Sequence, residues 1–168
     1  MTGAALLYPE YILTALGLVI LVADLFTPRS QKRNLAWLTL GGLLLALMAT
    51  ALVAMASPSR RVLPGWASSQ ISVDQFAVFF KIVILLATML VVLGAPDYVE
   101  RRLGHAQGEF YALLVFAALG MSLMAACTDL ISLYLAMEFT SLTSYVLAGY
   151  QKSEQKSAEA GLKYFLLG

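Results

Sequence analysis

The stretch that decides the fold is DLISLYLAMEFTSLTSYVLAGY, residues 129–150, which is mostly apolar and yet carries a carboxylate, Glu138, close to its middle. An acidic residue at the centre of a membrane helix costs about 2.5 to 3.5 kcal/mol on insertion scales. Either this stretch lies outside a membrane, or Glu138 faces protein or water for a functional reason. The rest of the sequence decides between the two.

The composition is that of a membrane protein. Hydrophobic residues make up 60% of the chain, charged residues 12%, and the mean hydropathy is +0.80, whereas a soluble domain has about 25% charged residues. The apolar residues gather into runs of about 20, which as helices cross a hydrocarbon core of about 30 Å. Such runs are too long for strands, and an open sheet cannot span lipid.

The sequence therefore predicts an all-α, polytopic transmembrane helix bundle with five complete membrane helices and the start of a sixth. Polar stretches containing Pro28, Pro58 and Pro64 stop the first two helices, and Pro96 ends the third. The segment 57–75 is the one loop long enough to hold surface structure. The expected helices span about residues 6–27, 34–56, 76–95, 109–127 and 130–149, with the last from about 158 to 168.

The last predicted helix is short. From Ser157, taken as its N-cap with Glu159 as a first-turn acid, to Gly168 there is room for only about 18 Å. We therefore interpret residues 1–168 as a single membrane domain that is the N-terminal fragment, or a truncated product, of a longer subunit.

The loop charges predict an orientation, because short cytoplasmic loops collect Lys and Arg. The loops after the first, third and fifth helices are basic, whereas the opposite side holds only Arg60 and Arg61. We expect the N-terminus to lie outside the cytoplasm. The basic loop residues are Arg29, Lys32, Arg33, Arg101, Arg102, Lys152 and Lys156.

Several function classes are excluded. A net charge of +1 without a basic stripe argues against nucleic acid. With one cysteine, Cys127, and one histidine, His105, the chain cannot build a disulfide, a cysteine-ligated cluster or a histidine metal site. No phosphate loop, dinucleotide fingerprint, nucleophile elbow or zinc-protease motif occurs. Any redox chemistry must belong to another subunit, so no cofactor or metal is expected in this chain.

Glu138 is the first candidate for carrying protons. It lies about 12 Å along its helix from Leu130 and about 16 Å from Gly149, near the bilayer centre, where ionisable residues mark proton or ion paths. Hydroxyl groups share or flank its face and could hold the carboxylate and a few waters. The alternative is a protonated Glu138 that only bonds across helices. The supporting hydroxyls are those of Tyr134, Ser141, Tyr145, Thr140 and Ser144.

Lys163 is the second candidate. It lies about 9 Å into the final helix, and its depth differs from that of Glu138 by about 7 Å, which long side chains or one water could bridge. The alternative is a lysine that snorkels to the interface.

The other charges within the predicted helices favour local roles. We expect Lys81 to snorkel, although it could reach a partner in the bundle. Glu10 suits the positive end of the first helix dipole, and Asp24 is expected at the interface. Gly41 and Gly42 are expected at a close helix contact.

Four segments resemble a known family: LYLAMEFTSLTSYVLAGY (133–150), KSAEAGLKYFLLG (156–168), LLYPEYILTALGLVILVADLF (6–26) and DQFAVFFK (74–81). They are similar to the antiporter-like membrane subunits of respiratory complex I, and to the subunit N family of NADH-quinone oxidoreductase in particular. The resemblance runs over nearly the whole chain. The intramembrane glutamate together with EAGLKYF is its most specific element.

The resemblance implies the N-terminal part of a bundle of about fourteen membrane helices built from inverted repeats. Glu138 would be the family's glutamate of helix five and Lys163 its lysine of helix six, both contributing to proton translocation coupled to quinone reduction elsewhere in the complex. The other membrane subunits and the lipid bilayer would be the partners. NADH, FMN, iron-sulfur clusters and quinone would belong to the whole complex, in a bacterial inner membrane with the N-terminus periplasmic.

Two alternatives remain. A subunit of a multisubunit sodium/proton antiporter shares the buried glutamate and a similar lysine; the opening Pro9-Glu10 and the EAGLKYF segment argue against it. The second alternative is a purely structural membrane subunit, in which Glu138 never changes its protonation.

Overall fold

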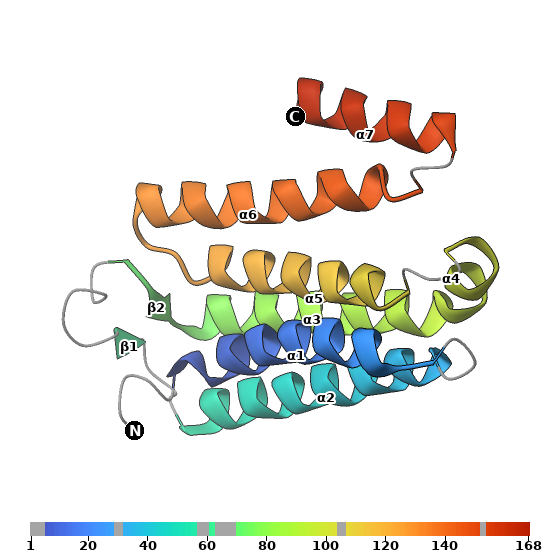
Figure 1. The fold of residues 1–168 in the computed structure, drawn as a ribbon. Helices are drawn as coiled ribbons and strands as arrows, with labels where there is room; N and C mark the ends of the chain where they lie inside the picture. Colours follow the sequence, from blue (N-terminus) through green and yellow to red (C-terminus); the bar gives the residue numbers. More distant parts are fainter. Residues whose placement is uncertain (1–5, 29–31, 57–60, 63–69, 104–106, 152–153) are drawn as a thin grey trace.

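The computed structural model describes residues 6–28, 32–56, 61–62, 70–103, 107–151 and 154–168. Within these ranges the chain forms seven helices and two short strands (Figure 1). The predicted all-α bundle of five complete membrane helices plus a shorter sixth is confirmed. The five long helices are α1 (Tyr8–Phe26), α2 (Arg33–Ala56), α3 (Gln75–Gly94), α5 (Gln107–Met124) and α6 (Leu130–Ala148); the short ones are α4 (Pro96–Arg102) and α7 (Gln155–Leu167).

The long helices pack side by side, with α5 at the centre. Helix α5 contacts α1, α3 and α6, and α7 packs on α6 at the outside of the molecule (Figure 1). Each of the five long helices is long and apolar enough to cross a membrane. In the membrane-spanning windows, 56% of α5 is buried but only 11% of α6. The structure thus has a packed four-helix core and an outer pair of helices.

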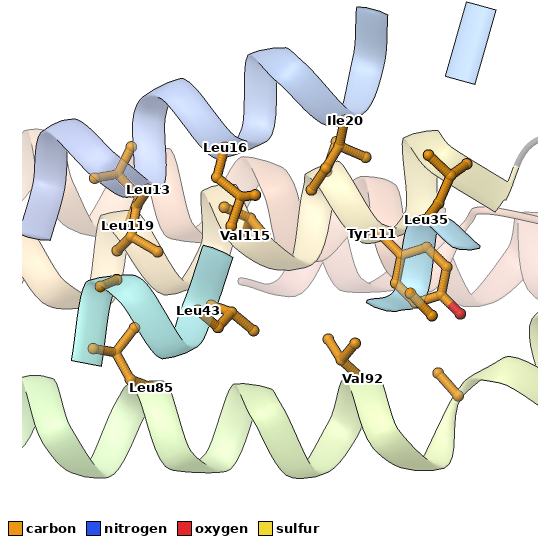
Figure 2. Close-up of a cluster of buried hydrophobic side chains, with 14 of the residues drawn as sticks. Leu13, Leu16, Ile20, Leu35, Leu43, Leu85, Val92, Tyr111, Val115 and Leu119 are labelled. Atoms are coloured by element: carbon orange, nitrogen blue, oxygen red, sulfur yellow. The ribbon is translucent and has the colours of Figure 1, made fainter. Parts of the chain in front are cut away.

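The core is built from apolar residues at helical spacing on α1, α2, α3 and α5 (Figure 2). On α1, Leu13, Leu16 and Ile20 recur at intervals of three and four residues and so lie on one face. Since lipid tails are as apolar as leucine, close van der Waals packing rather than removal from water holds such helices together.

The glycine pair in α2 shows where close packing is needed. A Cβ at Gly42 would overlap the side chain of Leu16 on α1, whereas a Cβ at Gly41 would meet nothing within 4 Å. The expectation of a close helix contact is therefore confirmed for Gly42 and wrong for Gly41, because the two residues point to different sides of the helix.

Helix α7 begins earlier than the sequence predicts. Its N-cap is Glu154 rather than Ser157. The Ser157 hydroxyl donates to the carbonyl oxygen of Ala148 at 3.0 Å and accepts from the backbone N–H of Gln151 at 3.2 Å. Ser157 therefore stabilises the connection between α6 and α7. From sequence alone, a serine at this position is expected to cap a helix.

Two features between the long helices were not predicted. The strands β1 (Arg61–Val62) and β2 (Ser72–Val73) pair antiparallel, and the backbone of Ser72 donates to Ala126 at 2.9 Å, which attaches this segment to the turn between α5 and α6. Pro96 does follow the end of α3, but it also begins α4, since proline is favoured in the first helical turn. His105 lies outside the described residues.

Candidate functional site

Glu138 lies on α6, a helix that begins at Asp129, whose carboxylate accepts from the backbone N–H groups of Ile131 and Ser132. The face of α6 toward α5 carries Phe139, in edge contact with Phe116 at 6.2 Å between ring centroids. Glu138 lies away from that face by helical geometry and is half-buried. The carboxylate is therefore on the side of α6 that the core helices do not cover.

One of the predicted hydroxyl partners reaches Glu138 within the described residues. The side chain of Tyr134, one turn earlier, hydrogen-bonds to Glu138. Ser144 instead donates to the carbonyl oxygen of Thr140 at 2.8 Å, and Ser141 is half-buried on the same side of the helix as Glu138. Among these described residues, Tyr134 thus bonds to Glu138, and Ser141 shares its side of the helix.

Tyr145 belongs to a different cluster. Its ring makes edge contacts with Tyr164 at 4.8 Å and Phe165 at 5.8 Å, both on α7. It also lines a largely apolar cavity of about 610 Å³ between α5, α6 and α7. Tyr145 therefore helps to seat α7 on α6 rather than to hold Glu138, which lies about 10 Å nearer the start of the helix.

The structure does not bring Lys163 to Glu138. The ammonium group of Lys163 pairs with Glu159, one turn earlier on α7, at 2.5 Å, and both side chains are more than half exposed. Within the part of the chain that the structure describes, no three His, Cys, Asp or Glu side chains gather to hold a metal ion.

A buried ion pair confirms the alternative given above for Lys81, a partner in the bundle. Lys81 of α3 pairs with Glu10 of α1 at 2.6 Å, and their side chains are 1% and 5% exposed. The hydroxyl of Ser122 on α5 donates to the same Glu10 oxygen at 3.2 Å. The prediction that Lys81 snorkels is wrong, because a carboxylate in the first turn of α1 gives its ammonium group a partner inside the bundle.

A second ion pair lies at the other end of α1. Asp24 accepts from Lys32 at 2.7 Å and from the backbone N–H of Gly108 at 3.2 Å. The nearby Tyr150 hydroxyl donates to Glu109 at 3.3 Å, and burial together with the charge of Glu109 raises the pKa of Tyr150. This polar end joins α1, α5 and the chain after α6.

The fold and these buried charges define a class: a polytopic, all-α membrane protein with ionisable residues inside its helix bundle. The model of a membrane family described as "NADH:quinone oxidoreductase/Mrp antiporter, TM" matches residues 127–168, the region of α6 and α7.

Relatives extend the match over the whole chain. NADH-quinone oxidoreductase subunit N of Trichlorobacter lovleyi is 41% identical over 95% of this chain and 31% of its own length. The subunit N of Moorella thermoacetica is 42% identical over 100% of this chain and 34% of its own length. The chain is thus similar over nearly its whole length to the subunit N family of NADH-quinone oxidoreductase, and it spans about a third of the length of these relatives.

A solved structure has the same fold. A chain of respiratory complex I from Thermus thermophilus with bound aureothin superposes with a TM-score of 0.72 and is 29% identical, over 95% of this chain and 32% of that one. The sequence-based recognition of this family is thereby confirmed.

Proposed function

We propose that this chain is part of a membrane subunit that translocates protons in a proton-pumping NADH:quinone oxidoreductase. The reaction at the quinone takes place elsewhere in the complex and shifts charge along buried ionisable residues, which changes their proton affinities by linkage. The subunit is part of an enzyme without a redox centre in residues 1–168. NADH, FMN, iron-sulfur clusters and quinone are bound by other subunits.

The observation that carries the proposal is Glu138 on a helix long and apolar enough to span a membrane. A charge at that depth faces protein or water rather than lipid, and the core helices do not cover its side of α6. We expect other helices of the complex to cover this side and to supply a cationic partner, with Tyr134 holding the carboxylate from its own helix. Ser141 lies on the same side of α6 and supports the path there, while Ser144 and Tyr145, which bond to Thr140 and pack on α7, would support it from flanking positions.

Lys163 has a role that depends on rearrangement. Its partner Glu159 is exposed and one turn away, so the pair is weak and easily exchanged. We propose that Lys163 leaves Glu159 for the polar network around Glu138 when α7 is enclosed by neighbouring helices.

The distribution of basic residues over the two ends of the bundle supports an orientation in the membrane. The C-terminal ends of α1, α3 and α6 lie at one end of the molecule (Figure 1), and basic residues at that end include Arg33, Arg101 and Lys156. By the positive-inside rule this end is cytoplasmic. The N-terminus of the multi-pass subunit is then periplasmic in a bacterial inner membrane, as part of a single membrane domain.

The test uses the native complex in inverted membrane vesicles. With Glu138→Gln we expect NADH-driven acidification and NADH-quinone electron transfer to fall together while the complex stays assembled. Glu154→Gln, an exposed carboxylate before α7, is the matched control and leaves both rates near wild type. Unchanged acidification in Glu138→Gln would refute a proton-carrying role for this residue.

A subunit of a multisubunit sodium/proton antiporter is the alternative, favoured by the family description that names both kinds of protein for residues 127–168. The relatives matched over the whole chain are subunits of the oxidoreductase. Purification of the native assembly separates the two: flavin and iron-sulfur absorbance in the purified material supports the oxidoreductase, and their absence supports the antiporter.

A further inference from the structure

We propose that Glu10, Lys81 and Ser122 form a second, hydrated proton-exchange site inside the helix core, separate from Glu138 on α6. This inference rests on the proposed function, since it adds a site to the same translocation. Its residues come from α1, α3 and α5, the helices of the core, and none of them belongs to the α6–α7 region that the family model matches.

The first argument is burial. The two charged side chains are 1% and 5% exposed, so both are almost completely removed from bulk solvent. Replacing a buried ion pair by apolar residues of similar volume is commonly neutral or stabilising. A purely packing role would be served as well by leucine and methionine, which abound in this chain. Ionisable residues inside membrane segments point to function by default.

The second argument is the incomplete bonding of the pair. The other carboxylate oxygen, Oε2 of Glu10, is buried and has no hydrogen-bond partner in the described residues. Besides its ion pair with Glu10, the Lys81 ammonium group has no bonded acceptor there either, although it carries three donors. Buried polar atoms without protein partners are commonly bonded to internal water. The ligand of this site is therefore water, held between Glu10 Oε2 and the free donors of Lys81.

The third argument is the surroundings. Leu6, Val53 and Val73 form a small apolar cluster with Val78 packed against it. Leu6 precedes Glu10, and Val78 precedes Lys81, by about one helical turn, so this cluster lies between the pair and the nearby end of the bundle. The hydroxyl of Thr14 donates to the backbone carbonyl oxygen of Glu10, and that of Thr88, about two helical turns after Lys81, donates to a carbonyl of its own helix. The apolar cluster thus separates the charges of the site from the nearby end of the bundle.

The exchange step is a proton transfer. An N–H bond of the Lys81 ammonium group breaks, its electron pair stays on the nitrogen, and an O–H bond forms at Glu10, directly or through the water. Total charge is unchanged, so the neutral pair of amine and carboxylic acid avoids the desolvation of two ions. Ser122 accompanies the change, since its hydroxyl can donate to the carboxylate and rotate when that oxygen becomes protonated.

The experiment compares Glu10→Gln with Lys81→Met, singly and together, in the assembled native complex reconstituted into liposomes. The double variant removes both charges and so leaves no uncompensated ion. We expect it to assemble and to transfer electrons, and to move fewer protons per electron than wild type. The control double variant, Asp24→Asn with Lys32→Met at the other end of α1, keeps the wild-type proton-to-electron ratio.

A wild-type ratio in the Glu10→Gln, Lys81→Met double variant would overturn the proposal and leave the pair as a structural contact. If the double variant does not assemble, labelling of the wild-type complex by a hydrophobic carbodiimide decides, because this reagent modifies protonated carboxyl groups. Modification of Glu10 during turnover, read by mass spectrometry, supports the site; Glu138 modified with Glu10 unmodified overturns it. Unchanged NADH-driven acidification in Glu138→Gln would instead refute the proposed function.

Discussion

The two Lys–Glu pairs on α3 and α7 show how different the inner and outer parts of the molecule are. Lys81 and Glu10 come from separate helices and are almost wholly buried, whereas Lys163 and Glu159 are neighbours on one helix and more than half exposed. A buried pair has lost hydration and depends on its geometry, while an exposed pair is screened and contributes little. The inner pair joins two helices inside the bundle, whereas the outer pair lies within one helix at the surface.

The largest effect should follow from breaking the inner pair on one side only. Lys81→Met leaves Glu10 charged and buried without a cation, a loss of about 3 to 5 kcal/mol in the free energy of unfolding. Thermal unfolding of the detergent-solubilised protein measures it. Lys163→Met is the outer counterpart and should cost less than about 1 kcal/mol. Equal losses in the free energy of unfolding in the two variants would contradict the difference proposed between the inner and outer pairs.

A smaller effect is expected at the contact between α6 and α7. A Cβ at Gly161 would come within 2.7 Å of the Gly149 Cα atom, so Gly161→Leu should separate the two helices at a cost of about 1 to 3 kcal/mol. Protease sensitivity of α7 in the solubilised protein reports the separation. Gly41→Leu, where a Cβ meets open space, is the control and should leave protease sensitivity unchanged; similar changes in both would show that the glycine contact does not hold α7.

Helix capping gives a third comparison. The carboxylate of Asp74 accepts from the backbone N–H of Ala77 at 2.8 Å and so caps α3, whereas Glu154 at the start of α7 makes no capping hydrogen bond through its side chain. Asp74→Ala should cost about 1 kcal/mol, and Glu154→Ala close to nothing, as measured by denaturant unfolding of the solubilised protein. A larger loss in Glu154→Ala would mean that α7 depends on a contact outside the described residues.

The smallest expected effect concerns the turn that joins the two regions. Burial, and then the charge of Asp129, raise the pKa of the Cys127 thiol above its ordinary value of 9.0. Because alkylation requires the thiolate, iodoacetamide should react more slowly at pH 8 than with an unstructured cysteine. Asp129→Asn removes the negative charge, lowers the pKa and speeds the reaction, while asparagine still caps α6. A slower reaction in Asp129→Asn would contradict this assignment.

The long helices were predictable because their apolar runs match the membrane thickness and Pro28 and Pro96 mark their limits. Glu138 stood out for the same reason, as a charge in an apolar run. The Glu10–Lys81 pair did not, because each residue lies near a helix end, where a local role suffices: the dipole for Glu10 and snorkelling for Lys81.

What joins these two residues is the packing of α1 on α5 and of α5 on α3, which sequence spacing does not reveal. The β1–β2 pair and the backbone ties of Ser157 depend on contacts between distant segments in the same way. A charge near a helix end can therefore find a buried partner on any other helix that ends on the same side of the membrane.

The most direct test of proton carriage at Glu138 is infrared difference spectroscopy of the native complex during NADH turnover. We expect a carboxylic acid C=O band that appears or disappears with turnover, is present in wild type and in Glu154→Gln, and is missing in Glu138→Gln. A difference spectrum identical in wild type and Glu138→Gln would mean that the protonation of Glu138 does not change, and would contradict its role in translocation.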